Sequence, residues 1–255
     1  MDSAAGLWPS VSTPLTINQA KQDVRERVWT LLERRRVARF PGAPGRIPNF
    51  VGAEAAATRL ASVPEWQSAR VIKANPDAPQ LPVRARALAD GKLLYMAVPR
   101  LTGEKPFICL DPRRLRPPLR QAASISGAAK LGTPVAIDRM QHVDLIVCGT
   151  VAVSRTGVRV GKGGGFSDLE FALLVVAGLV DDRTVVATTI HALQLVRGDL
   201  PETGHDFRVD LIVTSDEVIR AERVRRPSGI VWGELDEKKL AAIPVLRRMK
   251  PSVHR

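Results

Sequence analysis

The chain has 255 residues, of which 45% are hydrophobic and 25% charged, an ordinary globular composition at a length that suits one large domain. Only 4% are aromatic, so the core must consist mainly of Ala, Val, Leu and Ile, as in a buried parallel sheet covered by helices. A net charge of +12 attracts polyanions, but no aromatic RNA-binding motif accompanies the basic runs, so nucleic acid is a lesser alternative to anionic small molecules.

The first predicted element is a helix with Thr16 as its candidate N-cap, preceded by a flexible tail at 1–14. Its apolar stripe has helical spacing. The stripe consists of Val24, Val28, Leu31 and Leu32. The Pro- and Gly-rich stretch 41–48 then interrupts helical structure, and a second helix is predicted at 52–62.

From residue 69 onward, strand-like and helix-like segments alternate. The predicted strands cover 69–74, 92–99, 143–154, 183–196 and 209–219, and the predicted helices cover 83–91, 121–132, 168–179 and part of 236–249. This alternation predicts an α/β protein, a three-layer α/β/α sandwich with a mostly parallel sheet. Neither a repeat nor a long linker follows residue 48, so we expect a single domain at 15–250.

Cysteine usage and apolar patterning bear on the compartment. Cys109 and Cys148 lie in separate apolar runs without further ligands at metal-binding spacing, and we expect buried free thiols. The N-terminus lacks the organisation of a signal peptide, and the longest apolar stretch, 169–180, contains Glu170 and is too short for a bilayer. These features predict a cytoplasmic protein with no membrane contact.

The most informative segment is the glycine-rich run RVGKGGGFSD at 159–168. Its glycines are Gly161, Gly163, Gly164 and Gly165. They expose the backbone and permit positive φ angles that turn several N–H groups toward one point. The predicted helix that follows would direct its positive end to the same point, and Arg159 and Lys162 add two charges. The segment is neither a Walker A loop nor a Rossmann motif; it predicts a phosphate site, with a ligand-free hairpin as the alternative.

This run resembles the motif of the 5-formyltetrahydrofolate cyclo-ligases, also called methenyltetrahydrofolate synthetases, which reads Gly-x-Arg-Leu-Gly-x-Gly-x-Gly-Tyr-Tyr-Asp after a strand. The positions in step with it are Gly157, Arg159, Gly161, Gly163, Gly165 and Asp168. The resemblance covers roughly 16–220 and is strongest at 143–219. It implies a fold similar to that of the sugar-phosphate isomerases and CoA transferases.

The resemblance also implies ligands for MgATP. Lys21 and Arg25, four residues apart on one helix face, match a family pair that reaches ATP. Asp168 and Asp206 would hold Mg²⁺ together with phosphate oxygens and water. His205, next to Asp206, would have a minor role in positioning Asp206 without binding the metal itself. The residues implied to contact ATP are Lys21, Arg25, Arg159, Gly161, Lys162, Gly163, Gly164, Gly165 and Phe166.

The implied reaction is the ATP- and Mg-dependent cyclisation of 5-formyltetrahydrofolate to 5,10-methenyltetrahydrofolate, with release of ADP and phosphate. Positioning and charge neutralisation carry such a reaction, so the implied catalytic residues are the four cations Lys21, Arg25, Arg159 and Lys162. Asp77 and Phe166 would contact the folate. Asp77 takes the place of a folate-binding Glu in the family, and Phe166-Ser167 replace its Tyr-Tyr pair.

These departures resemble a divergent branch, the methenyltetrahydrofolate synthetase domain-containing proteins. Segments 46–57 and 229–246 also lie outside the ordinary family pattern. They leave open a noncatalytic nucleotide- or folate-binding protein of the same fold, or a kinase-like activity on another small substrate. An RNA-associated basic protein is the lesser alternative. Oligomeric state is not predicted.

Overall fold

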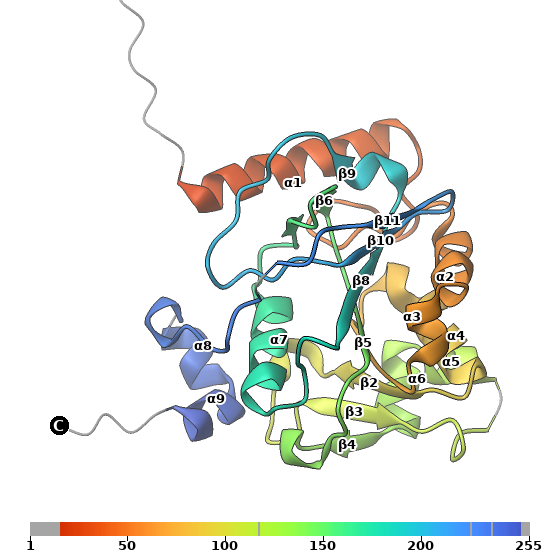
Figure 1. The fold of residues 1–255 in the computed structure, drawn as a ribbon, viewed down its shortest axis with the longest axis vertical. Helices are drawn as coiled ribbons and strands as arrows, with labels where there is room; N and C mark the ends of the chain where they lie inside the picture. Colours follow the sequence, from red (N-terminus) through yellow and green to blue (C-terminus); the bar gives the residue numbers. More distant parts are fainter. Residues whose placement is uncertain (1–15, 117, 225, 236, 251–255) are drawn as a thin grey trace, which may run out of the picture.

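A mixed sheet of eight strands runs through the centre of the computed structural model, which describes residues 16–250 except 117, 225 and 236 (Figure 1). Its order is β11-β10-β8-β5-β1-β2-β3-β4; the strands from β10 to β2 run parallel, and the outer strands are antiparallel to their neighbours. The strands are β1 Val71–Ala74, β2 Leu93–Ala97, β3 Phe107–Leu110, β4 Thr133–Val135, β5 Leu145–Cys148, β8 Val185–Thr189, β10 Leu211–Val213 and β11 Val218–Arg220. The predicted tail at 1–14 lies outside the described residues.

Helices cover both faces of this sheet (Figure 1). One face packs against α2 Ala53–Ala61, α3 Pro64–Ser68, α4 Leu81–Ala89, α5 Leu119–Ala122 and α6 Ile125–Leu131. The other packs against α7 Phe166–Val176, α8 Glu237–Ala242 and α9 Pro244–Met249. Short 3₁₀ turns lie at Ala78–Gln80, Pro99–Leu101, Ile137–Arg139, Ala192–Gln194 and Trp232–Glu234. The predicted three-layer α/β/α sandwich is confirmed, whereas a single domain at 15–250 stays a prediction.

A second, smaller sheet carries the glycine-rich run. Its order is β7 Arg159–Val160, β6 Ala152–Ser154 and β9 Leu195–Val196. Helix α1, Ile17–Arg34, lies across it and buries Val24, Val28 and Leu32 of the predicted stripe, with Leu31 only partly buried (Figure 1). The predicted cap is confirmed, because Thr16 Oγ1 accepts a hydrogen bond from the Gln19 amide at 3.3 Å. This packing holds α1 beside the glycine-rich run.

The prediction of one strand at 143–154 is wrong. The run contains β5 of the main sheet and β6 of the small sheet, separated at Gly149. A Cβ at Gly149 would lie 2.9 Å from Ile47 Cγ1 and 3.1 Å from Asp77 Oδ2, so only glycine fits where the chain changes sheets. A uniformly apolar run cannot reveal such a break, because both halves are buried strands.

Two predicted helices are also each divided. The predicted helix at 121–132 is two helices, because α5 ends at Ala122 and α6 begins at Ile125. Ser124 Oγ accepts a hydrogen bond from the Gly127 amide at 2.9 Å and so caps α6. Near the C-terminus, α8 ends before Ile243 because Pro244 can begin a helix but cannot continue one.

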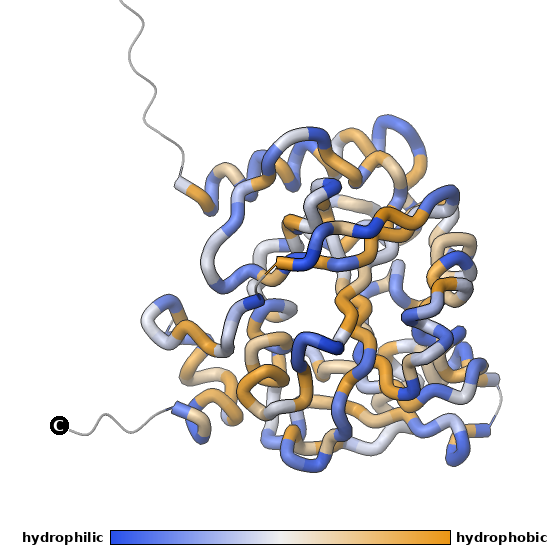
Figure 2. Tube along the Cα trace, viewed as in Figure 1, coloured by the Kyte–Doolittle hydropathy of each residue, from blue (hydrophilic) through white to orange (hydrophobic). Residues whose placement is uncertain are grey.

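The topology places a switch point at the carboxyl ends of β1 and β5. These strands are neighbours, with Ala74 opposite Val147, and the chain leaves them toward opposite sides of the sheet. Ligands of open α/β sheets bind outside the strand ends at such a switch point. Figure 2 shows mostly apolar colouring along the central strands of the sheet, where β5 lies.

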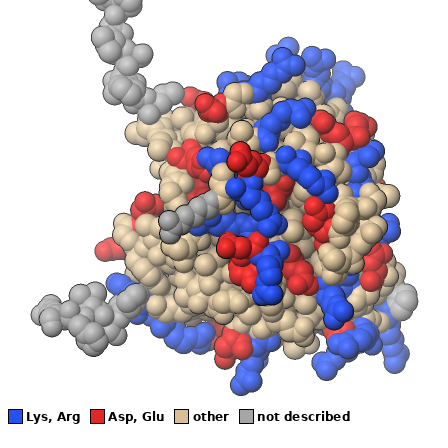
Figure 3. Space-filling model, viewed as in Figure 1, with Lys and Arg blue, Asp and Glu red and all other residues tan. Residues whose placement is uncertain are grey.

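The remaining bulk predictions have simple outcomes. Cys109 and Cys148 are both free thiols, but only Cys148 is buried, and Cys109 is partly exposed. Burial raises the pKa of Cys148, as expected for an inert structural thiol. Within the described residues no helix is long and apolar enough to cross a membrane. On the face drawn in Figure 3, basic side chains gather around the C-terminal end of α1, and elsewhere basic and acidic side chains alternate.

Candidate functional site

The glycine-rich loop joins β7 to α7. Gly163 and Gly165 adopt φ angles of 102° and 66°, in the left-handed region that favours glycine. Helix α7 begins at Phe166, two residues before the predicted start, and Gly165 is its N-cap without any side-chain cap. The first backbone N–H groups of α7 are therefore available to an anion, and Asp168 lies in the first turn.

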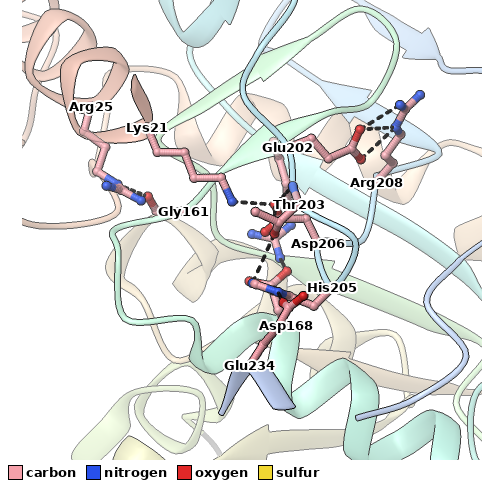
Figure 4. Close-up of polar contacts among 11 residues, drawn as sticks. Lys21, Arg25, Gly161, Asp168, Glu202, Thr203, His205, Asp206, Arg208 and Glu234 are labelled. Carbon is pink, nitrogen blue, oxygen red and sulfur yellow. Dashed lines mark hydrogen bonds and ion pairs between the residues drawn. The ribbon is translucent and has the colours of Figure 1, made fainter. Parts of the chain in front are cut away.

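Cations surround the backbone of this loop. A Cβ at Gly161 would lie 3.4 Å from Arg159 Nη1, and a Cβ at Gly163 would lie 3.4 Å from Arg25 Cζ. Arg25 Nε also donates a hydrogen bond to the Gly161 carbonyl at 2.7 Å (Figure 4). Two guanidinium groups therefore lie against the loop backbone, and the positive φ of Gly163 is what requires glycine there.

Arg159 is a buried cation that fixes the position of Asp168. It forms an ion pair with Asp168 and stacks on the Phe207 ring, with Cζ 3.9 Å from the ring centroid. Burial alone would lower the pKa of Arg159, but Asp168 and other nearby carboxylates outweigh burial and raise it. Arg159 Nε is buried and has no hydrogen-bond partner among the described residues.

Lys21 forms an ion pair with Asp206, which ties α1 to the loop after β9 (Figure 4). Asp206 Oδ2 also accepts hydrogen bonds from the Thr203 amide and hydroxyl, each at 2.7 Å. Burial alone would raise the pKa of Asp206, but the bonds from Lys21 and Thr203 outweigh burial, and the pKa lies below its ordinary value. Asp206 also acts electrostatically on Arg25 and Arg159, so the four side chains belong to one cluster.

Asp168 and Asp206 are the two carboxylates that the sequence predicts as Mg²⁺ ligands. Asp168 uses Oδ1 and Asp206 uses Oδ2 in these ion pairs; within the described residues the second oxygen of each accepts no hydrogen bond. The described part of the chain contains no group of three or more His, Cys, Asp or Glu residues that could hold a metal. A metal here would depend on phosphate oxygens and water for its other ligands, as Mg²⁺ commonly does.

His205, the residue before Asp206, contacts side chains on both of its ring nitrogens. His205 Nε2 lies 3.2 Å from Thr203 Oγ1, and His205 Nδ1 pairs with Glu234 (Figure 4). His205 thus contacts Thr203, which binds Asp206, and the supporting role of His205 stays a prediction.

Asp77, the predicted folate contact, lies at the edge of the same loop. It follows β1, and its Oδ1 lies 2.8 Å from Lys162 Nζ. The Asp77 side chain is 13% exposed and that of Lys162 46% exposed, and their ion pair joins the segment after β1 to the glycine-rich loop. Of the predicted residues, Lys162 and Asp77 lie at this end, and Lys21, Arg25 and Asp206 gather around Gly161, Gly163 and Arg159.

The structure adds a buried ion pair that the sequence reasoning missed. Lys73 of β1 pairs with Glu170 of α7, and Lys73 Nζ donates to Asn75 Oδ1 at 2.7 Å. Asn75 Nδ2 in turn lies 3.4 Å from Ser167 Oγ, at the start of α7. A signal was present, since Lys73 is the one charge in the strand VIKA and Glu170 lies within the apolar run LEFALLVV. This network links β1 to the first turns of the helix behind the loop.

Fold and site together define an α/β protein with a basic, glycine-rich loop at the carboxyl edge of a parallel sheet. The model of the 5-formyltetrahydrofolate cyclo-ligase family matches residues 17–215, most of the chain, and the chain belongs to this family.

Relatives support this assignment. Proteins named methenyltetrahydrofolate synthase domain-containing protein are 41% identical in Mus musculus and 40% identical in Bos taurus, each over 237 residues and 91% of this chain. The chain spans only 62% to 63% of the length of these relatives. The NMR structure of Aquifex aeolicus 5,10-methenyltetrahydrofolate synthetase has a TM-score of 0.50 at 22% identity, covering 82% of this chain and 94% of that one, and shares the fold.

Proposed function

We propose that this chain binds MgATP at the glycine-rich loop and uses it to close the ring of 5-formyltetrahydrofolate or a related folate. The observation that carries the proposal is the pairing of Asp168 with Arg159 and of Asp206 with Lys21 beside the uncapped N-terminus of α7. Each pair presents one unbonded carboxylate oxygen next to a cation, which suits a metal-bridged polyphosphate. Family membership adds the folate.

Several cations and the N-terminus of α7 each contact a different part of the triphosphate. The N–H groups at the start of α7 bind one phosphate, while Arg25 and Arg159 reach the loop from either side. Lys162 exchanges Asp77 for a phosphate oxygen when the ligand enters. Asp168 and Asp206 would hold Mg²⁺, which when bound would neutralise negative charge on the phosphate groups.

Ring closure then needs positioning more than covalent chemistry. The formyl oxygen attacks the γ-phosphorus and ADP leaves; N10 attacks the activated formyl carbon, and loss of phosphate gives the methenyl product. Phe166, at the start of α7, offers a ring face to the folate, and Asp77 offers a carboxylate once Lys162 has turned to phosphate. The site residues thereby bring the two reacting groups together.

A nucleotide-binding protein that acts on another substrate, or on none, is the second candidate. The pairing of Asp77 with Lys162 favours it, because this carboxylate is neutralised before any folate arrives. Ser167 favours it too, since its hydroxyl contacts Asn75 where the family motif has a tyrosine. The RNA-associated alternative rests on the net charge alone.

The test is a spectrophotometric assay of the purified protein with 5-formyltetrahydrofolate and MgATP, read as methenyltetrahydrofolate formation. We expect product with the wild-type protein and with Asp138→Ala, an exposed carboxylate outside the site. Asp168→Ala should abolish it. MgATP binding without product would favour the second candidate and contradict the cyclo-ligase proposal.

A further inference from the structure

The C-terminal segment, defined here as residues 226–249, borders the glycine-rich loop although the family match ends at residue 215. A cavity of about 80 Å³ separates the two. Its walls include Gly165, Asp168 and His205 on the loop side and Glu234, Leu235 and Lys239 on the side of the segment. In Figure 1, α8 and α9 lie beside α7, so the segment and the start of α7 face each other.

The C-terminal segment is held in place by contacts near both of its ends. At its start, Arg226 pairs with Asp210 and donates to the Thr184 carbonyl at 2.7 Å. Near its end, side chains of α9 and of the residue before it join the core that covers α7. They are Ile243, Val245 and Leu246, each at most 1% exposed. Because both ends are anchored, the position of Lys239 between them is defined by packing.

Lys239 is the group that this segment brings to the loop. Its Nζ lies 5.9 Å from the Phe166 ring centroid and 3.1 Å from where a Cβ at Gly165 would lie. Among the described residues its ammonium has no hydrogen bond or ion pair, whereas Lys21, Lys162 and Arg159 each pair with a carboxylate. Lys239 therefore brings an ammonium without a bonded partner to the uncapped start of α7.

A second donor at the loop is also unsatisfied. Arg159 is 4% exposed, and its Nε has no partner within the described chain, although its Nη1 lies close to Gly161. An unpaired ammonium beside the uncapped start of α7, and an unpaired guanidinium N–H in the residue that borders Gly161, favour an oxyanion with several acceptor oxygens. A carboxylate ligand offers only two oxygens, so phosphate fits this set of donors better.

We propose that Lys239 is a phosphate-binding residue of this site, supplied by the C-terminal segment, and that it closes the site over the phosphate held at the start of α7. The proposal rests on the proposed function and deepens it, because it adds a ligand contact beyond the family match. In the structure the ammonium lies over the Phe166 ring. When a polyphosphate enters, the ammonium turns to it across the cavity.

The test is calorimetric titration of the full chain with inorganic tripolyphosphate. Since a hydrogen bond to a charged group is worth about 1.5–3 kcal/mol, Lys239→Met should raise the Kd about tenfold or more. Lys239→Arg should restore most of the affinity. Lys238→Met, an exposed neighbour on the same helix, should change the Kd less than about twofold. Thermal unfolding of each variant checks that the fold is kept.

The outcomes separate the two proposals. Wild-type binding that Lys162→Met weakens but Lys239→Met does not would overturn the role of Lys239 and leave the phosphate loop standing. Equal losses in Lys238→Met and Lys239→Met would also overturn it, because they would show only a general charge effect. A wild-type chain that does not bind tripolyphosphate would overturn both proposals.

Discussion

Lys162 Nζ lies 2.8 Å from Asp77 Oδ1, so the lysine of the glycine-rich loop and the carboxylate expected to contact folate are bound to each other. The two residues are 85 positions apart in the chain. Their pairing means that a phosphate must displace Asp77 to reach Lys162, and it couples the two halves of the site.

Asp77→Asn should therefore strengthen phosphate binding. The exchange removes the competing carboxylate, and since partly exposed ion pairs are worth up to about 1 kcal/mol, we expect the Kd for tripolyphosphate to fall about two- to fivefold. Calorimetric titration measures this, with Asp138→Asn as the exposed control. Weaker binding in Asp77→Asn would show that Asp77 positions Lys162 for phosphate instead of competing for it.

Lys73→Met should strongly destabilise the fold. The side chains of Lys73 and Glu170 are 2% and 7% exposed, so the exchange leaves a buried carboxylate unpaired. Such a loss costs about 3–5 kcal/mol, measurable as the free energy of unfolding in urea. Replacing both residues, as Lys73→Met with Glu170→Leu, should recover much of it.

The exposed pair of Arg86 and Asp90 supplies the comparison for this experiment. Arg86→Met should cost less than about 1 kcal/mol. If Lys73→Met cost no more than Arg86→Met, the buried pair would contribute little to the link between β1 and α7.

Lys21→Met should shift acid unfolding to higher pH. The pKa of Asp206 is depressed in the folded chain, so its contribution to stability is present above the unfolded pKa, about 3.9, and is lost as pH falls through the folded value. Without Lys21, the effect of burial is opposed less strongly and the pKa of Asp206 rises. The folded protein therefore begins to lose stability at a higher pH. Circular dichroism between about pH 2 and pH 7 spans this window. Identical acid transitions in wild type and variant would contradict the assigned role of Lys21, and Asp206→Asn should abolish the difference.

Gly157→Ala should affect folding, although Gly157 belongs to the family motif. Its φ is 84°, and a Cβ would collide with the carbonyl of Val209, whose amide donates to the Gly157 carbonyl at 2.9 Å. We expect a loss of about 1–3 kcal/mol, from strain in the turn between β6 and β7. Gly164→Ala is the control, since its φ is outside the left-handed region and its Cβ would meet only the movable Phe166 ring. Equal melting temperatures for the two variants would refute this assignment.

Local features made parts of this protein predictable. The cap at Thr16 and the glycines before α7 act over a few residues, so their sequence patterns carry the information. The break at Gly149 is different, because it depends on Ile47 and Asp77, which are distant in the chain. Long-range contacts of this kind leave no periodicity in a single sequence.

The candidate site divides in the same way. Lys21, Arg25 and Asp206 could be named from a resemblance. That the two cations lie near the carboxylate of Asp206 becomes visible only in three dimensions. Lys239 could not be found from the motif, because it lies beyond the part of the chain that resembles the family. Lys73 could have been noticed as a lone charge in a buried strand, yet its partner on α7 could not.

The central claim is that Asp168 and Asp206 make the glycine-rich loop a magnesium-dependent ATP site. The most direct measurement is the Kd of ATP with and without Mg²⁺, for the wild-type chain and for Asp168→Asn, with thermal unfolding as the fold check. We expect Mg²⁺ to tighten ATP binding to the wild type and to have no such effect on Asp168→Asn. This variant should bind metal-free ATP at least as tightly as the wild type does, because a negative charge has been removed. ATP binding that does not respond to Mg²⁺ in the wild type, or that responds equally in Asp168→Asn, would contradict the claim.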